Sequence, residues 1–242
     1  MPKVSLFIPC FVDQFFPETG LATVDLLRRA GCEVEYSREQ TCCGQPSHNS
    51  GFRKDTKVLA EKFIRLFSDA EVVVAPSASC VAMVRLEYGK LDLDPGIRKE
   101  WEALCPRLFE LSEYLVDELR FDQLERPFPH RVAYHASCHG LRELNIYEQP
   151  LALLRTVPAI ELVELDDRHA CCGFGGTFAA KFSNLSTAIG QDKLEAIQRS
   201  GAEVVTATDD SCLMHIAGLA SRQKLPFRTM HYARILAGEV LK

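Results

Sequence analysis

The sequence lacks the features that mark several large classes of protein. No run among its 242 residues approaches the ~20 apolar side chains needed to cross a bilayer, so we expect no transmembrane segment. The net charge is −5 and no basic run is present, which argues against a nucleic-acid partner. The apolar start at residues 4–8 is brief and has no small-residue cleavage site after it, so we expect a strand there rather than a signal peptide. These absences predict a cytoplasmic protein, in which thiols stay reduced.

What the sequence has instead is ten cysteines, eight of which form one pattern used twice. The motif Cys-Cys-Gly occurs in each copy, with one isolated cysteine before it and another after it. Equivalent cysteines lie 128, 129 and 132 positions apart, and such nearly constant spacing indicates an internal duplication. The eight are Cys10, Cys42, Cys43 and Cys80 in the first copy, and Cys138, Cys171, Cys172 and Cys212 in the second.

Short apolar runs alternate with amphipathic helical patterns in both copies, which predicts an α/β fold. Hydrophobic residues make up 47% of the chain and charged residues 25%, the balance of a globular domain with a substantial core. We expect two pseudo-symmetric, Rossmann-like halves, each with a small parallel sheet. Strands are predicted at 4–8, 33–36 and 71–75, and again at 132–135, 161–165 and 203–208, with helices between them.

The predicted domains are a first repeat over 1–125 and a second over 126–242. The first includes a helical insert at about 89–125, in which leucines at helical spacing over 104–119 predict one helical stretch. Each patterned cysteine follows the end of a predicted strand. Ligands of open α/β sheets bind at the carboxyl edge, so we expect the four thiols of each half to meet there.

Adjacent thiols indicate a particular kind of metal site. A lone zinc ion usually takes Cys-x-x-Cys knuckles, and directly adjacent cysteines fit that geometry poorly. They suit an iron–sulfur cluster, which takes four thiolates, and each half supplies four. We therefore predict one or two clusters per chain, with [4Fe–4S] as the expected type. The alternative is that the thiols are structural and pack as small hydrophobes, which we expect of Cys32 and Cys105, outside the pattern.

Several other residues near the cysteines are candidates for supporting roles. Gly44 and Gly173 would allow close backbone approach or positive φ, and helix N-termini would favour thiolates at Cys80 and Cys212. Histidines near the cysteines are candidates for hydrogen bonds to sulfur, although ordinary surface or core roles remain open. They are His48, His135, His139, His169 and His215, with His139 the one retained as a candidate beside the cluster.

Three further features have less specific interpretations. The glycines of 173–176 are interpreted as room for a cluster, because they do not match Gly-x-Gly-x-x-Gly. Asp166 and Asp167 are interpreted as a solvated turn rather than an acid–base pair. Arg142 is a candidate for binding a carboxylate. No catalytic acid or base is predicted.

The duplicated pattern, with HASCH at 135–139 and CCGFGGTF at 171–178, resembles the cysteine-rich CCG domain family. This family includes the cysteine-rich subunit of heterodisulfide reductase and the iron–sulfur subunits of glycolate oxidase and anaerobic glycerol-3-phosphate dehydrogenase. The resemblance spans almost the whole chain, and without ferredoxin-like cysteine runs the chain is most similar to the family's lactate-utilisation members. It implies an iron–sulfur redox subunit of a multi-component L-lactate-oxidising system. The implied partners are a ferredoxin-type iron–sulfur subunit and a third subunit.

The sequence departs from the heterodisulfide reductase pattern at two positions. That pattern ends each motif in Cys-x-x-Cys and supplies five thiols, whereas here the first of these positions is Ser77 in one half and Asp209 in the other. Four thiols fit an ordinary [4Fe–4S] cluster. A thiol–disulfide oxidoreductase, an electron carrier of another dehydrogenase and a structural zinc protein remain as alternatives.

Overall fold

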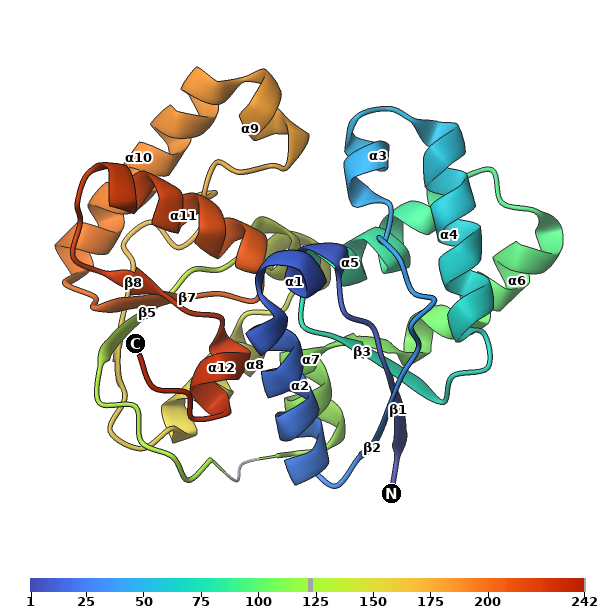
Figure 1. Ribbon diagram of the computed structural model, residues 1–242, viewed down its shortest axis with the longest axis horizontal. Coiled ribbons are helices and arrows are strands. Elements are labelled where there is room, and N and C mark those ends of the chain that lie inside the picture. Colours follow the sequence, from blue (N-terminus) through green and yellow to red (C-terminus); the bar gives the residue numbers. More distant parts are fainter. Residues whose placement is uncertain (122–123, 242) are drawn as a thin grey trace. The chain divides into compact units, whose positions relative to one another are not determined.

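The computed structural model describes residues 1–121 and 124–241, in two compact units, Met1–Phe121 and Asp122–Lys242. Each unit contains a four-stranded sheet in which all paired strands are parallel (Figure 1). The predicted α/β class with two similar halves is confirmed. Residues 122 and 123, in the predicted insert, lie outside the described residues.

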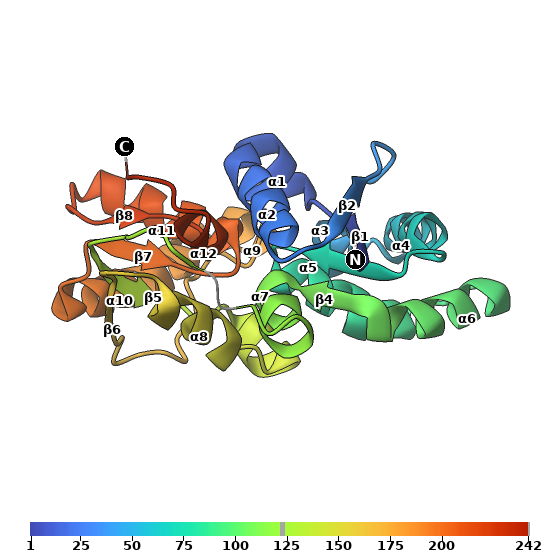
Figure 2. The ribbon, with the colours of Figure 1, turned by 90° about the horizontal axis from the view of Figure 1, so that it is seen from below.

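The first unit orders its strands β2-β1-β3-β4. Helix α2 covers one face of this sheet, and α4 and α6 cover the other (Figures 1 and 2). The strands are β1 (Lys3–Leu6), β2 (Glu33–Tyr36), β3 (Val72–Ala75) and β4 (Leu108–Glu110). The helices are α1 (Cys10–Phe15), α2 (Pro17–Arg29), α3 (Gln45–Asn49), α4 (Arg53–Phe67), α5 (Ala78–Ala82), α6 (Pro95–Leu104) and α7 (Leu111–Glu113).

The local sequence explains the main elements of this unit. Strand β3 is a run of β-branched residues that suits a sheet covered on both faces, and Val73 and Val74 are fully buried. Helix α2 has Pro17 at its first position, and Gly31 follows its end with φ +82°. Helix α4 buries a stripe of side chains at helical spacing, namely Thr56, Ala60, Phe63, Ile64 and Phe67.

The predicted helical stretch over 104–119 is wrong in its middle. Helix α6 ends at Leu104, and β4 pairs with β3 before α7 and a π-helical turn, Tyr114–Glu118. Pro106 explains the break, because proline has no N–H to donate within a helix. Leu104, Leu108, Leu111 and Leu115 are buried, but Leu108 is buried as a strand residue.

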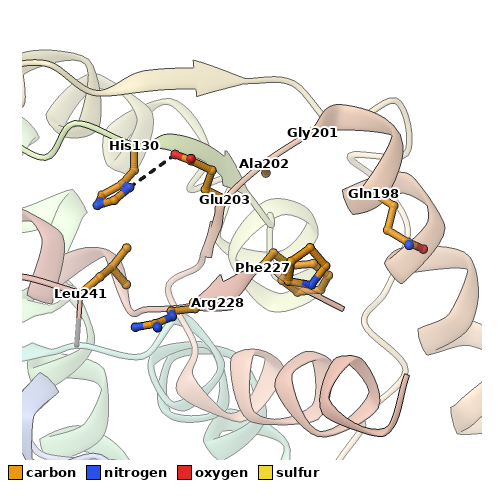
Figure 3. Close-up of a pocket in the computed structure, with 9 residues that line it drawn as sticks. His130, Gln198, Gly201, Ala202, Glu203, Phe227, Arg228 and Leu241 are labelled. Carbon is orange, nitrogen blue, oxygen red and sulfur yellow. Dashed lines mark hydrogen bonds and ion pairs between the residues drawn. The ribbon is translucent and has the colours of Figure 1, made fainter. Parts of the chain in front are cut away.

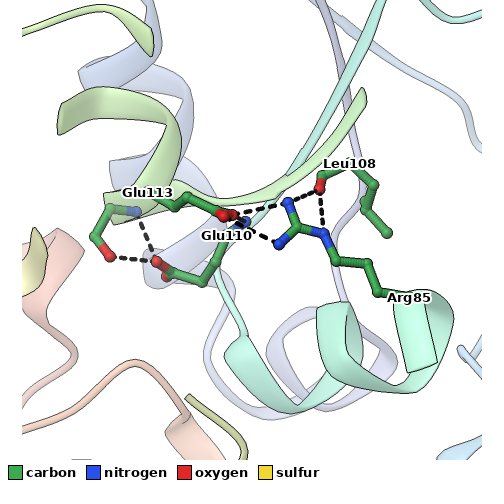
Figure 4. Close-up of polar contacts among 5 residues, drawn as sticks. Arg85, Leu108, Glu110 and Glu113 are labelled. Carbon is green, nitrogen blue, oxygen red and sulfur yellow. Dashed lines mark hydrogen bonds and ion pairs between the residues drawn. The ribbon is translucent and has the colours of Figure 1, made fainter. Parts of the chain in front are cut away.

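An ion pair holds the start and the end of β4 in place (Figure 4). The guanidinium of Arg85 lies 2.9 Å from the Glu113 carboxylate, and its Nε donates to the carbonyl of Leu108 at 2.7 Å. Glu110 begins α7 with a capping box, since its side chain accepts from the Ser112 N–H and its own N–H donates to Glu113. These contacts anchor a strand that the sequence pattern did not indicate.

The second unit repeats the topology with order β6-β5-β7-β8. Helices α10 and α11 pack together on one face, and α8 and α12 pack together on the other (Figure 1). The strands are β5 (Arg131–Tyr134), β6 (Glu161–Val163), β7 (Val204–Thr206) and β8 (Arg228–Thr229). The helices are α8 (Glu148–Thr156), α9 (Thr177–Lys181), α10 (Ser183–Ser200), α11 (Asp210–Arg222) and α12 (Tyr232–Leu236), with a π-helical turn at His139–Leu144.

The sequence did not predict β8 or α12, because a two-residue strand and a five-residue helix are too short to show periodicity. Helix α10 ends at the predicted glycine, Gly201, which has φ +66°. Among the described residues, no helix has both the length and the apolar character required to cross a membrane.

A cavity of about 680 Å³ lies at the amino ends of β5, β7 and β8 (Figure 3). Its polar lining includes His130 and Glu203, whose Nδ1 and Oε2 atoms are 3.4 Å apart, and its apolar lining includes Phe227 and Leu241. The patterned cysteines of this unit follow the opposite, carboxyl ends of the strands. The cavity is therefore separate from the cysteine site.

Candidate metal centres

The topology brings the four patterned cysteines of the first unit to one edge of the sheet. Cys10 begins α1 just after β1, Cys42 and Cys43 follow β2, and Cys80 lies in α5 just after β3. These three strands are neighbours and parallel, so their carboxyl ends meet. We call this group the first quartet.

The thiols of the first quartet form a chain of contacts. The Sγ atoms of Cys43 and Cys80 lie 3.3 Å apart, and Cys42 forms hydrogen bonds with both Cys10 and Cys43. The 3.3 Å separation far exceeds a disulfide bond of about 2.05 Å, and all ten cysteines of the chain are free thiols. Cys10 is exposed whereas Cys43 and Cys80 are buried, so the quartet runs from the surface inward.

The second unit assembles its four cysteines in the same way. Cys138 follows β5, Cys171 and Cys172 follow β6, and Cys212 lies in the first turn of α11 after β7. Cys171 forms hydrogen bonds with Cys138 and Cys172, and Cys172 with Cys212. Cys138 and Cys171 are half-buried, and the other two are buried. We call this group the second quartet.

Each quartet holds one acidic thiol. Hydrogen bonds from Cys10 and Cys43 lower the pKa of Cys42 to about 3, and the Gly44 N–H, 3.4 Å from its sulfur, acts in the same direction. The same arrangement lowers the pKa of Cys171 far below its ordinary value, with the Gly173 N–H at 3.3 Å. A thiolate is the form of cysteine that binds metals. Four soft sulfur donors, one of them with its pKa lowered by its neighbours, fit an iron–sulfur cluster.

The two glycines of the motifs adopt the left-handed backbone that they were predicted to allow. Gly44 has φ +86° and Gly173 has φ +89°. At Gly173 a Cβ would lie 2.5 Å from the carbonyl oxygen of Ser186, which means that α10 takes the space beside this glycine. The room provided by Gly173 therefore serves helix packing, while its N–H faces the sulfur of Cys171.

The candidate histidines lie in different environments. His139 Nδ1 is 3.6 Å from the Cys138 sulfur, within the range of an interaction with sulfur. His48 instead lies 3.2 Å from the Glu87 carboxylate and 3.1 Å from Arg53. His48 therefore interacts with charged side chains of the first unit.

His169 and His215 have contacts of their own as well. The His169 carbonyl accepts from Arg142 at 2.5 Å, and its Nε2 accepts from the neighbouring Arg168. His215 Nε2 lies 3.4 Å from the hydroxyl of Ser186, and burial lowers the pKa of this histidine. Arg142, the predicted carboxylate anchor, thus donates to backbone in this structure.

His135 lies beside two sulfurs of the second quartet. Its side chain is buried, and both ring nitrogens lack a hydrogen-bond partner among the described residues. One ring nitrogen and the Sγ atoms of Cys172 and Cys212 all lie within 4.8 Å of one another. Burial, with the nearby charge of Lys193, lowers the pKa of His135 to about 3, so the ring is neutral at physiological pH. A metal bound beside these two sulfurs would give a partner to one of the unpaired ring nitrogens.

Sequence reasoning missed Lys193, a fully buried lysine on α10. Its Nζ lies 2.9 Å from Oδ1 of Asp167, whereas Asp166 pairs with Arg199 at the surface. The predicted solvated turn is thus correct for Asp166 only, because Asp167 partners a buried ammonium. The place of Lys193 on the buried stripe of α10, next to Leu194, comes from the packing of the second unit.

The two positions at which a fifth cysteine is missing are both buried. The Ser77 hydroxyl caps α5 by accepting from the N–H of Cys80 at 3.3 Å. Asp209 precedes α11, and its carbonyl accepts from the N–H of Cys212 at 3.1 Å. Ser77 thus has a capping role that does not require sulfur, which argues against a five-thiol site in the first unit.

Two parallel α/β units with a cysteine quartet at each carboxyl edge define a duplicated cysteine-rich protein. The chain belongs to the CCG family of cysteine-rich domains, whose model matches residues 4–85 and 132–217. It is 44% identical to Lactate utilization protein A of Exiguobacterium sp. (strain ATCC BAA-1283 / AT1b) over 98% of this chain and 97% of that protein. The protein of the same name from Bacillus subtilis (strain 168) is 40% identical over 97% of this chain and 98% of that protein. The predicted family is confirmed.

Proposed function

We propose that this chain is an iron–sulfur redox subunit of a multi-component system that oxidises L-lactate. The observation that carries the proposal is the assembly of four free thiols, one of them acidic, at the same place in both units. Relatives at 40–44% identity over nearly the full chain are named Lactate utilization protein A, which supports lactate as the source of the electrons.

The two quartets are the proposed ligands, with one [4Fe–4S] cluster in each. Such a cluster supplies one-electron redox chemistry when bound. The chain's own contribution is to hold the sulfurs and to stabilise their negative charge. The N–H groups of Gly44 and Gly173 point at sulfur, and hydrogen bonds of this kind tune the potential of a centre. Burial of Cys43 and Cys172 keeps water from the inner sulfurs.

The proposed partners are a ferredoxin-type iron–sulfur subunit and a third subunit, working together in the cytoplasm. The letter A in the relatives' name supports a system of several components. We assign electron transfer rather than lactate binding to this chain, because Arg142, the predicted carboxylate anchor, donates to the His169 carbonyl. Oxidation of lactate itself would take place on a partner subunit.

Growth on L-lactate tests both parts of the proposal. We expect a strain of the source organism that lacks this chain to lose growth on L-lactate as sole carbon source. The wild-type chain should restore growth, and Cys138→Ser should not. The matched control is Cys105→Ser, which changes a half-buried thiol outside both quartets.

The contradicting outcomes separate the two parts. Unimpaired growth of the deletion strain on L-lactate would refute lactate as the source of the electrons. Lost growth that both Cys10→Ser and Cys138→Ser restore fully would remove the quartets as the redox centres.

A further inference from the structure

The two units place different residues at one equivalent position beside their quartets. Phe7 directly follows β1 and His135 directly follows β5, and they are 128 positions apart, the same spacing as between Cys10 and Cys138. Each donates its backbone N–H to the third strand of its own sheet, at 2.9 and 2.7 Å. Their backbones are therefore equivalent, and a comparison of their side chains is direct.

In the first unit this position belongs to an apolar cluster. Phe7 is fully buried, and its ring meets Phe63 edge-on with centroids 4.9 Å apart. Phe67 adds a second edge contact at 6.0 Å. In the first unit the position equivalent to His135 is thus packed among aromatic rings. In the second unit His135 is just as buried, at 1% exposure, but it has two polar ring nitrogens.

A helix residue near this position is likewise apolar in the first unit and polar in the second. Each buried residue of α4 has a buried counterpart 130 positions later in α10, which places Lys193 where the first unit has Phe63. Lys193 is fully buried and its Nζ pairs with Asp167 at 2.9 Å. Two aromatic rings in edge contact in the first unit are therefore replaced by two polar groups in the second.

His135 and Lys193 are both buried polar groups, but among the described residues only Lys193 has a polar partner for its side chain. Burial of a polar group is unfavourable unless it finds a partner, and Asp167 provides one for Lys193. His135 has no hydrogen-bond partner at either ring nitrogen among the described residues. Nearby, its ring and the sulfurs of Cys172 and Cys212 present three donor atoms within 4.8 Å of one another.

We propose that His135 is a fifth donor of the second quartet, binding through a ring nitrogen to the same metal centre that Cys172 and Cys212 hold. A neutral imidazole has one lone pair for a metal and one N–H for a hydrogen bond. The first quartet remains a four-thiol site, because Phe7 offers no donor atom. This inference rests on the proposed function, and it makes the two centres of one chain chemically different.

The difference has a consequence for electron transfer. Histidine ligands in place of thiolates raise the reduction potential of an iron–sulfur centre, since they carry no negative charge. His135 as an additional neutral ligand leaves the charge of the second centre unchanged, and His135→Cys would add a negative ligand there. We therefore expect His135→Cys to lower the potential of one centre and to leave the other unchanged.

The test uses the full chain reconstituted anaerobically with ferrous iron and sulfide, then reduced. Pulsed EPR on wild-type protein with and without ¹⁵N-histidine should show the strong nitrogen coupling of a metal-bound imidazole, and this measurement needs no variant. The coupling should be lost in His135→Phe, which copies the residue of the first unit. It should persist in the control His139→Phe, which removes the ring next to Cys138.

Three results would overturn the inference. Iron-loaded wild-type protein without strong histidine coupling would show that His135 is not a ligand, and weak coupling alone would assign it only a hydrogen bond. Strong coupling that survives in folded, iron-loaded His135→Phe would assign the ligand to another histidine. A chain that takes up no iron at all would instead refute the proposed function, and this inference with it.

Discussion

The glycines of the two Cys-Cys-Gly motifs offer a matched test of how each motif is held. Gly44→Ala and Gly173→Ala both place a side chain at positive φ, +86° and +89°. Left-handed backbone costs a non-glycine residue about 1–2 kcal/mol. Alanine also restricts the unfolded chain, which offsets about 0.4–1 kcal/mol of that cost. The backbone conformation alone should therefore destabilise either variant by about 1 kcal/mol.

The surroundings then separate the two variants. At Gly44 the new Cβ would meet side-chain atoms of Thr56 and Leu59 at 3.5 Å or more, which is ordinary contact. At Gly173 it would lie 2.5 Å from a backbone oxygen and 3.0 Å from the backbone nitrogen of Gly190, both on the long helix α10. Overpacking of this kind costs about 1–3 kcal/mol. We therefore expect Gly173→Ala to be the more destabilising variant by that amount.

Urea unfolding of the reduced, metal-free protein measures the difference. Far-UV circular dichroism follows both units, and fluorescence of Trp101, the single tryptophan, reports on the first unit. Gly44→Ala should shift the fluorescence transition modestly, and Gly173→Ala should lower the transition of the second unit by the larger amount. Equal costs for the two variants, or a larger cost for Gly44→Ala, would refute the packing described for α10.

Two further predictions concern charge in the second unit and thiol acidity. Asp167→Ala strands the buried ammonium of Lys193 and should lower the free energy of unfolding by about 3 kcal/mol, whereas Asp166→Ala, at an exposed pair, should leave it nearly unchanged in the same urea assay. A small effect of Asp167→Ala would show that Lys193 finds another partner. In metal-free protein, alkylation of Cys42 by iodoacetamide should be independent of pH from about 5 to 8, because a thiol with its pKa lowered to about 3 is already ionised there. Burial raises the pKa of Cys105 to about 11, so its rate should rise roughly tenfold per pH unit over the same range, and equal profiles by peptide mass spectrometry would contradict the proposed thiolate.

Much of this architecture was accessible from local sequence. The β-branched run of β3 and the glycines at the ends of α2 and α10 predicted those elements directly. The constant spacing between the two sets of cysteines, combined with strands that precede them, predicted that the thiols meet at carboxyl edges. That prediction depends only on parallel strand order, which short βαβ units enforce.

The remaining features depend on tertiary contacts. Leu108 has the spacing of a helical residue, but Pro106 and pairing with β3 make it part of a strand. Lys193 looks like a surface residue until its position on the buried stripe of α10 and its pairing with Asp167 are known. For His135, sequence shows only a histidine near a cysteine. Its burial without a partner among the described residues comes from the packing of the second unit.

Iron and acid-labile sulfide per chain, measured on anaerobically reconstituted protein, test the central claim most directly. Two quartets with one [4Fe–4S] cluster each predict about eight irons and about eight sulfides per chain. Cys10→Ser and Cys138→Ser should each remove about half, and Cys105→Ser should remove none. A chain that takes up no iron, binds zinc in its place, or keeps all its iron in both quartet variants would contradict the assignment of the quartets as redox centres.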